Sequence, residues 1–472
     1  MEHLKKKLSK SNQEHLLRFW EELTDEDRNQ LENDINELNL QETTTYFKKA
    51  MESSQRVGQN VLDDKVQAID DRKIASVKTS TKEELKKYQA LGLKEVAEGR
   101  VAVVLLSGGQ GTRLGVNYPK GMYDVGLPSR KTLFQLQVER ILCLQNMAKQ
   151  RYGKYGEITW YILTSEATHE ATVTYLSEHK YFGLKESNVK AFKQSMLPCF
   201  TLDGKIILDK KHRVSKAPDG NGGLYRALKN QGILKDMEQR GIRSVHAHSV
   251  DNILIKVADP IFIGYCLHSE ADCGVKVIEK SSPTEAVGVV CKVDDHYQVV
   301  EYSEISKSTS ELRHADGQLV YNAANICNHY FTIDFLKNIA DFHEDDLILH
   351  VARKKIPYVN DKGERISAPK SPNGIKIEKF VFDVFPFAKN FTVWQGTREE
   401  EFSPLKNSDP VGQDCPCTAR RDLLNLHKKW LLDAGAKNVS GDVEICPLLS
   451  YAGENLDQLA NNQSFVGPQI LE

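Results

Sequence analysis

The sequence has no long hydrophobic run and almost no net charge. Its 472 residues include 63 Lys and Arg against 65 Asp and Glu, which leaves a formal net charge of -2. A chain without an excess of basic residues has no general attraction for nucleic acid, so we exclude nucleic acid as its main ligand. No stretch is long enough to span a bilayer, and the charged start MEHLKKKLSK is not a secretory signal. We therefore expect a cytoplasmic protein without a membrane partner.

Cysteine is sparse and shows no pairing pattern. The nine cysteines are an odd number scattered over a long chain, which favours free thiols in a reducing compartment. The closest pair, Cys415 and Cys417, is not matched by a second pair, which argues against a zinc site. His246 and His248 would share one strand face, but no third ligand follows at a useful spacing. Packing in the core is the favoured interpretation of both histidines.

Two well-known phosphate-binding motifs are missing. No string matches the Walker loop, and Leu114 stands where the dinucleotide fingerprint needs its third glycine. The string LLSGGQGTRLG nevertheless follows the apolar run Val101–Val104 directly. A glycine-rich turn after a buried strand exposes backbone N–H groups to an anion. We therefore predict a phosphate-binding loop of another kind, with a plain tight turn as the alternative.

The chain is long enough for two or three domains. Residues 1–100 predict a helical N-terminal region, in which a capping box at residues 11–14 precedes apolar residues at helical spacing. We expect this region to pack without taking part in chemistry. Residues 392–472 are mixed and predict a small C-terminal lobe.

Residues 101–391 alternate strands and helices, which predicts a central domain of the α/β class. The expected fold is a Rossmann-like, mostly parallel sheet flanked by helices. Strands are predicted at 101–106, 158–164, 188–193 and 244–250, with a helix at 132–149 and another at about 166–179. Short connections between later strands, from about residue 273 to 305, predict an attached antiparallel section.

Ligands of such a sheet bind beyond the carboxyl ends of its strands. After the first strand, Arg113 and Lys120 supply two cations that suit a polyphosphate. Asp251 ends a later strand, where a magnesium ligand is expected, although it could instead cap the next helix. The loop APDGNGGLYRAL could hold a base or sugar through main-chain groups and Asn221, with a plain turn as the alternative. Lys376, Lys379 and Lys406 are further candidates, although a single lysine is more often a solvated side chain than a catalytic one.

Together these stretches resemble a known family. Gly108-Gly109-x-Gly111-Thr112-Arg113-Leu114 followed by Pro119-Lys120 resembles the signature of sugar-1-phosphate nucleotidyltransferases. Longer strings such as VDNILIKVADP, NGIKIEKFVFD and EFSPLKN resemble the eukaryotic UDP-N-acetylglucosamine pyrophosphorylases over nearly the whole chain. The resemblance implies that UTP and N-acetylglucosamine 1-phosphate react to give UDP-N-acetylglucosamine and pyrophosphate, with Mg²⁺ (or Mn²⁺) as cofactor. N-acetylgalactosamine 1-phosphate is a further expected substrate, and the protein is expected to be a monomer or homodimer.

The resemblance also implies a role for individual residues. Those expected along the nucleotide and its base are Leu106, Ser107, Gly108, Gly109, Gln194 and Gly220. Those expected around the sugar are Asn221, Gly288, Glu301, Tyr302, Asn325, Phe380 and Phe382. Arg113 and Lys120 are expected to hold the leaving phosphates, and Asp251 to stand near the metal and the ribose. Lys376 and Lys406 are expected to grip the α-phosphate and the sugar phosphate.

The chain departs from the family pattern at Ser107, Ser195, His248 and the string DCPC at 414–417. Three alternatives to the implied activity remain. One is a uridylyltransferase for glucose 1-phosphate or a broader set of sugars, and another is a catalytically weak paralogue that senses nucleotide sugars or acts as a scaffold. The third is a glycosyltransferase, which would want an Asp-x-Asp motif where the chain has Asp251-Asn252-Ile253.

Overall fold

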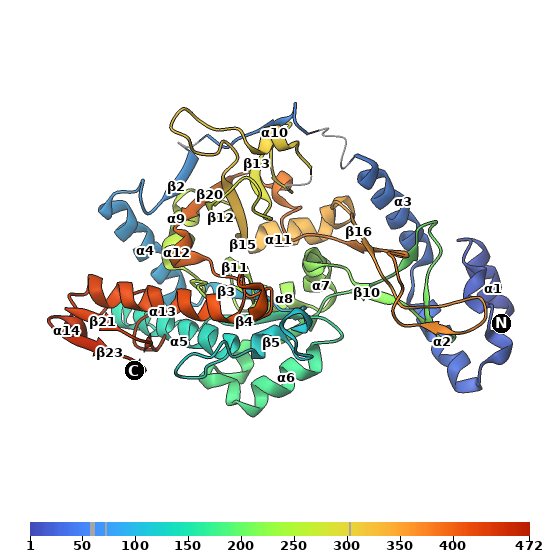
Figure 1. Cartoon of the computed structure of the whole chain (residues 1–472), viewed down its shortest axis with the longest axis horizontal. Coiled ribbons are helices and arrows are strands. Elements are labelled where there is room, and N and C mark those ends of the chain that lie inside the picture. The colour runs from blue at the N-terminus through green and yellow to red at the C-terminus, as the bar shows by residue number, and fades with distance from the viewer. Residues whose placement is uncertain (57–61, 71–72, 302–303) are drawn as a thin grey trace. The chain divides into compact units, whose positions relative to one another are not determined.

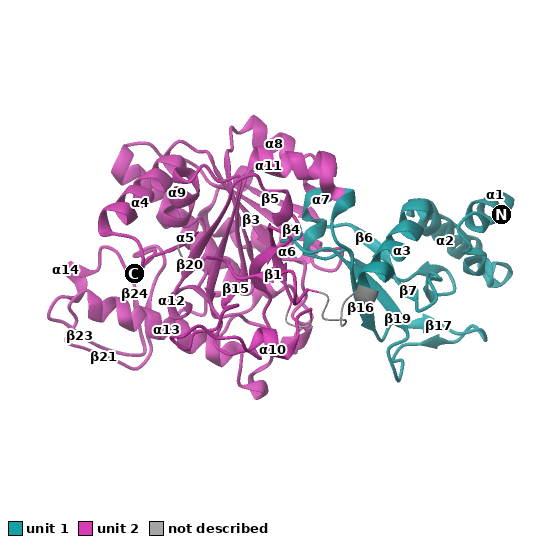
Figure 2. Ribbon diagram, turned by 90° about the horizontal axis from the view of Figure 1, so that it is seen from above, with its two compact units in different colours: residues 1–61, 194–226, 345–383 teal, residues 62–193, 227–344, 384–472 magenta. Residues whose placement is uncertain are grey.

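The computed structural model describes residues 1–56, 62–70, 73–301 and 304–472. Its chain divides into two compact units, each built from segments far apart in the sequence (Figure 2). Unit 1 takes residues 1–61, 194–226 and 345–383, and unit 2 takes residues 62–193, 227–344 and 384–472. Each unit therefore draws on more than one of the three regions predicted from the sequence. The boundaries predicted at residues 100 and 391 stay a prediction.

Unit 2 is built on a mostly parallel sheet flanked by helices, which confirms the predicted fold class (Figure 1). Its main path is β2 (Ile74–Ser76), β20 (Phe391–Gly396), β12 (Cys273–Glu279), β15 (Ala323–Thr332), β11 (Ser244–Ser249), β3 (Val101–Leu106), β4 (Thr159–Thr164) and β5 (Val189–Lys193). The strands from β11 to β5 are parallel, as are β12, β20 and β2. Only β15 runs antiparallel to both of its neighbours on this path, β11 and β12. The predicted antiparallel section is β13 (Val289–Val293) and β14 (His296–Val300), and β13 also pairs with β1 (Val66–Gln67).

The central strands are buried because helices cover both of their faces. All six positions of β3 and all six of β4 are buried, as a continuous apolar run predicts for a parallel strand. The predicted helix at 132–149 is α5 (Leu133–Tyr152), and Thr132 caps it by accepting the Gln135 N–H. The predicted helix after β4 is α6 (His169–Glu178).

Helix α4 (Lys82–Ala97) packs closely on α9 (Pro260–His268) at two glycines. A Cβ on Gly92 would lie 2.0 Å from the Pro260 carbonyl oxygen, and a Cβ on Gly264 would lie 1.8 Å from that of Tyr88. Only glycine permits this approach. The end of the region predicted as N-terminal packing helices is thus part of unit 2.

The remaining elements of unit 2 are short helices, one long helix and two small parallel sheets. The helices are α8 (Ile233–Gln239), α10 (Lys307–Ser310), α11 (Ile333–Asn338), α12 (Arg398–Glu401), α13 (Pro416–Asp433) and α14 (Asp457–Ala460). The small sheets pair β21 (Asn438–Ser440) with β23 (Ser464–Val466) and β22 (Val443–Ile445) with β24 (Gln469–Leu471). No described helix has the length and apolar character needed to cross a membrane.

Unit 1 combines helices with short antiparallel strands. Its helices are α1 (Glu2–Ser9), α2 (Asp25–Glu37), α3 (Leu40–Arg56) and the start of α7 (Leu224–Asn230). Its strand pairs are β6 (Met196–Pro198) with β10 (Lys216–Pro218), β8 (Leu208–Lys210) with β9 (Arg213–Val214), and β17 (Tyr358–Val359) with β18 (Arg365–Ile366). A three-stranded sheet runs β16 (His350–Lys354), β19 (Gly374–Glu378), β7 (Phe200–Thr201).

The capping box predicted at residues 11–14 is wrong. The segment after it forms two short 3-10 helices, Glu14–Leu17 and Trp20–Glu22, instead of one α-helix. The Gln13 side chain is used elsewhere: its amide donates to the Gly204 carbonyl at 3.0 Å, and its oxygen accepts the Ile206 N–H at 2.8 Å. Ser11, the residue expected to cap, lies instead in the turn after α1, where its N–H donates to the Leu8 carbonyl at 3.0 Å.

Buried histidines make unit 2 sensitive to acid. His246 and His248 lie in the core, as predicted, and burial lowers the pKa of His246 to about 4 and that of His248 to about 3. Burial also lowers the pKa of His329 to about 3. Neither ring nitrogen of His329 has a hydrogen-bond partner among the described residues. The imidazole is therefore held neutral in the folded state.

Replacing His329 by Phe is expected to flatten the pH dependence of stability. Below the unfolded pKa of about 6.5, the unfolded state binds a proton that folded His329 does not bind until about pH 3, so stability falls as the pH falls through this window. At pH 5 the loss is about 2 kcal/mol for this group. Urea unfolding of both proteins at pH 7 and pH 5 measures the difference. The exposed His314→Gln variant should keep the wild-type pH dependence, and an unchanged dependence in His329→Phe would contradict the argument.

Candidate functional site

The glycine-rich loop follows β3 at the carboxyl edge of the parallel strands. The Ser107 N–H donates to the Leu163 carbonyl on β4 at 2.8 Å. The Ser165 hydroxyl, just after β4, donates to the Gly108 carbonyl at 2.8 Å. Apart from Gly109 and its two chain neighbours, no described residue has a heavy atom within 4 Å of the place that a Cβ on Gly109 would take. The loop is thus anchored by its neighbours and open at its glycine.

Two cations follow this loop. Arg113 lies in a single 3-10 turn, Thr112–Leu114, and is exposed. It forms no ion pair within the part of the chain that the structure describes. Lys120 begins the next turn, and its Nζ lies 3.5 Å from Oδ2 of Asp251. Lys120 is therefore paired with a carboxylate that follows another strand, whereas Arg113 is available to an anion.

Asp251 stands at the end of β11 and does not cap a helix. Its Oδ1 accepts a hydrogen bond from the Ser249 hydroxyl at 2.8 Å. The cap of the next helix, α9, is Asp259, which accepts the Ile261 N–H at 3.0 Å. The alternative that Asp251 caps this helix is therefore wrong. A partly exposed carboxylate beside a hydroxyl offers the oxygen donors that Mg²⁺ prefers, so this position fits the expected metal.

Lys406 is brought beside Asp251 by backbone contacts. The N–H of Leu405 donates to the Asp251 carbonyl at 2.9 Å, and the N–H of Lys406 donates to the Asp414 carbonyl at 2.7 Å. The Lys406 ammonium lies 5.7 Å from the centre of the Phe402 ring. Lys406, which is 155 positions after Asp251 by numbering, thus joins the same strand edge.

Sequence reasoning missed the residue that joins these segments, Asn252. Its side-chain NH₂ donates to the Glu401 carbonyl at 2.7 Å, and its oxygen accepts the Ser403 N–H at 3.0 Å. The side chain therefore reinforces the isolated antiparallel bridge between Asn252 and Pro404. An amide residue directly after the predicted metal ligand is the signal that could have indicated this role.

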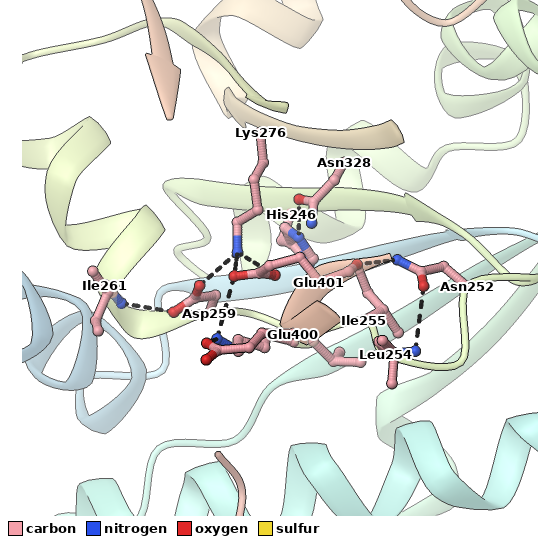
Figure 3. A network of polar contacts seen from close by, with 12 residues as sticks. His246, Asn252, Leu254, Ile255, Asp259, Ile261, Lys276, Asn328, Glu400 and Glu401 are labelled. Atoms are coloured by element: carbon pink, nitrogen blue, oxygen red, sulfur yellow. Dashed lines mark hydrogen bonds and ion pairs between the residues drawn. The ribbon is translucent and has the colours of Figure 1, made fainter. Parts of the chain in front are cut away.

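A buried ion cluster lies under the same segment (Figure 3). Nζ of Lys276, whose side chain is 0% exposed, lies 2.6 Å from Oδ2 of Asp259 and 3.0 Å from Oε2 of Glu401. Lys256 adds a second cation 3.3 Å from Oε1 of Glu401. Because Glu401 also holds Asn252, the cluster links β12 and α9 to the segment that carries Lys406.

Three of the residues predicted around the sugar lie together in unit 2. The Asn325 N–H donates to the Gly288 carbonyl at 2.9 Å. A Cβ on Gly288 would lie 2.9 Å from Oε1 of Glu301 and 2.6 Å from a methyl carbon of Val299. A larger residue at position 288 would have to displace the side chain of Val299 or of Glu301. Tyr302 lies outside the described residues.

Unit 1 holds a second group of predicted residues. Gly220 has φ +86°, and a Cβ there would lie 2.4 Å from the Lys379 carbonyl. Oδ1 of Asn221 accepts the Val381 N–H at 2.9 Å, and the rings of Phe380 and Phe382 lie 5.2 Å apart. The loop at 219–223 is thus docked on residues 379–381. Lysine 379, expected to be solvated, is instead buried, and its amine donates to the Tyr46 hydroxyl at 3.1 Å.

The predicted site residues consequently fall into two groups. Unit 2 contains Leu106, Ser107, Gly108, Gly109, Arg113, Lys120, Asp251, Gly288, Glu301, Asn325 and Lys406. Unit 1 contains Gln194, Gly220, Asn221, Lys376, Phe380 and Phe382. Within unit 1, Gln194 directly precedes Ser195, whose carbonyl accepts the Asp219 N–H at 3.1 Å, and Lys376 lies on β19. The role of each residue in binding stays a prediction.

Comparison with known proteins shows the family of the chain. A sequence profile of the family described as UTP–glucose-1-phosphate uridylyltransferase matches residues 43–457. The chain belongs to this uridylyltransferase family. The match extends over most of both units, from α3 to α14.

The relatives of the chain within the uridylyltransferase family carry related names. It is 48% identical over 493 residues to the "UDP-N-acetylhexosamine pyrophosphorylase-like protein 1" of Xenopus tropicalis, covering 100% of this chain and 96% of the relative. It is 43% identical to a "Probable UDP-N-acetylglucosamine pyrophosphorylase" of Dictyostelium discoideum, covering 99% and 97%. The solved uridine diphosphate N-acetylglucosamine pyrophosphorylase of Trypanosoma brucei matches with a TM-score of 0.84 at 30% identity, covering 98% and 97%. The resemblance seen in the sequence is thereby confirmed.

Proposed function

We propose that the protein transfers the uridylyl group of UTP to N-acetylglucosamine 1-phosphate and releases pyrophosphate. The observation that carries this proposal is the strand edge of unit 2, where an open glycine loop, Lys120, Asp251 and Lys406 come together. Membership of the uridylyltransferase family and the names of the relatives support the same reaction. The neighbouring Gly288, Glu301 and Asn325 supply polar groups for an N-acetylated sugar.

The reaction demands placement of charge more than covalent chemistry. An oxygen of the sugar phosphate attacks the α-phosphorus of UTP as the bond to the β-phosphate oxygen breaks, and negative charge moves to the leaving pyrophosphate. Both reactants are anions, so holding them in line and neutralising that charge supplies most of the acceleration. In this proposal Arg113 and Lys120 stabilise the pyrophosphate, and Lys406 holds the attacking phosphate.

Asp251 is proposed to bind Mg²⁺, or Mn²⁺ in its place. Its Oδ1 is oriented by Ser249, and its Oδ2 faces Lys120. A bound divalent ion would neutralise phosphate charge at this point. The hydrogen bond from Ser249 fixes the orientation of the Asp251 carboxylate. Without a metal ion, the ammonium of Lys120 partly compensates the negative charge of Asp251.

A pyrophosphate-release assay with a panel of sugar 1-phosphates tests the proposal. With UTP and Mg²⁺, we expect the highest kcat/KM with N-acetylglucosamine 1-phosphate, measurable turnover with N-acetylgalactosamine 1-phosphate and low turnover with glucose 1-phosphate. The Arg113→Ala protein, purified in the same way, controls for contaminating enzymes. Preference for glucose 1-phosphate would overturn the sugar assignment, and silence with every sugar would favour a scaffold role.

The setting of this activity is proposed as well. We expect the protein to act in the cytoplasm, as a monomer or homodimer. All nine cysteines are free thiols in the structure, which suits a reducing compartment. Fractionation of cells and light scattering of the pure protein test these two expectations.

A further inference from the structure

Two cysteines and an aspartate converge at the start of α13. Sγ of Cys415 lies 3.3 Å from Sγ of Cys417, and the ligand atoms of these residues and Asp409 all lie within 4.8 Å of one another. The Cys417 N–H donates to Oδ1 of Asp409 at 2.8 Å. Cys415 is fully buried, Cys417 partly buried and Asp409 exposed. A small ligand can therefore reach the group from the Asp409 carboxylate.

The charges of this cluster favour a cation. Asp409 forms no ion pair with any residue that the structure describes. Reactive thiolates that form disulfides or act as nucleophiles lie next to cationic groups. Here the thiols lie near the Asp409 carboxylate, and the Thr418 hydroxyl is 3.6 Å from Sγ of Cys415. Three groups that are anionic when deprotonated meet at one point, and a bound cation would compensate them together.

The dimensions are close to those of a tetrahedral zinc site. With bonds of about 2.3 Å to sulfur and about 2.1 Å to oxygen, ligand atoms in a tetrahedron lie about 3.6–3.8 Å apart. The two sulfurs at 3.3 Å and the carboxylate within 4.8 Å are close to these separations. The backbone is already held, because Pro416 begins the helix and the Cys415 N–H donates to the Thr418 hydroxyl at 3.0 Å.

We propose that Asp409, Cys415 and Cys417 bind a thiophilic divalent cation such as Zn²⁺, with water as the fourth ligand. The sequence pattern argued against zinc because it has no second cysteine pair, and the third ligand comes instead from a carboxylate eight positions before Cys417. Thiolate ligands select Zn²⁺ over Mg²⁺, so this site is distinct from the one at Asp251.

The bound ion would hold together the segment that follows Lys406, residues 407–417. The N–H groups of Lys406 and Asn407 both donate to the Asp414 carbonyl, at 2.7 and 2.9 Å. Asp414 lies inside the loop that the ion would close between residues 409 and 417. Metal binding does not depend on the proposed reaction, so the two proposals fail or stand separately.

Titration of the full-length protein tests the site. Protein that has been reduced, treated with a chelator and desalted is titrated with Zn²⁺ against a chromophoric chelator in excess Mg²⁺. We expect a single tight equivalent, a raised melting temperature, and ultraviolet thiolate-to-metal charge-transfer absorption when Cd²⁺ replaces Zn²⁺. Cys417→Ser and Asp409→Asn should each weaken Zn²⁺ binding by about tenfold or more, since even indirect partners of a metal contribute this much.

Cys327→Ser is the matched control, because Cys327 is also partly buried but lies outside the cluster. It should retain the tight equivalent. If a cysteine variant fails to fold, Asp409→Asn still tests the site, because Asp409 is exposed and its replacement should leave the fold intact. Absence of tight Zn²⁺ binding, its persistence in a Cys415→Ser/Cys417→Ser protein, or a disulfide between these cysteines in freshly reduced protein would overturn the proposal.

Discussion

Replacing Arg113 by Ala is expected to lower kcat by about a hundredfold or more, which is the typical cost of removing one preorganised donor to a developing negative charge. Arg113 is exposed and has no ion-pair partner among the described residues, so its loss should leave the fold intact. The effect should appear in kcat because the charge to be stabilised grows as pyrophosphate departs. Initial rates of pyrophosphate release at saturating UTP and sugar phosphate measure it.

Two further variants separate charge from geometry. Arg113→Lys keeps the charge but loses the planar fork of the guanidinium, and should recover only part of the rate. Arg151→Ala removes an exposed arginine in the last turn of α5 and should behave as wild type. Near-normal turnover of Arg113→Ala would refute the assignment, as would an equal loss in Arg151→Ala.

Replacing Lys276 by Met is expected to destabilise the protein by about 3–5 kcal/mol, the usual cost of breaking a buried ion pair from one side. The variant removes the ammonium that bonds Asp259 and Glu401, leaving two buried carboxylates with Lys256 as the nearest cation in the cluster. Methionine fills a similar volume, so the effect reports the charge and not a cavity. Urea denaturation at pH 7 measures the loss.

The exposed pairs of the same unit provide the comparison. Lys190 forms an ion pair with Asp236 at 3.0 Å but its side chain is 36% exposed, so Lys190→Met should cost less than about 1 kcal/mol. Adding Glu401→Gln to Lys276→Met should restore part of the stability by removing one uncompensated charge. A cost for Lys276→Met as small as that for Lys190→Met would contradict the role given to the cluster.

Local patterns were sufficient for the elements that form the core of unit 2. The apolar run 101–106 became β3, and the helix expected from Thr132 began there because its hydroxyl caps the first turn. The capping box predicted at residues 11–14 failed because Ser11 belongs to the turn after α1, and a 3-10 helix follows it in place of an α-helix. A capping motif predicts a helix start only where the chain after it forms an α-helix.

The candidate site was predicted where a motif and a strand end coincide. The glycine loop, Lys120 and Asp251 were located in this way, and the structure places Lys120 next to Asp251. Asn252 and the Asp409–Cys415–Cys417 cluster were missed because their partners lie at spacings that no motif records.

The amino-acid sequence alone specifies the α/β class, the glycine loop after the first strand and the family to which the chain belongs, because backbone hydrogen bonding and apolar periodicity act over a few residues. Tertiary structure decided the strand order, the burial of Lys276 between Asp259 and Glu401, and the place of Lys406 beside Asp251. The contact of Lys276 with Glu401 and that of Leu405 with Asp251 each join residues more than a hundred positions apart. They form only where packing of the whole sheet and its helices removes the alternatives, which no local pattern encodes.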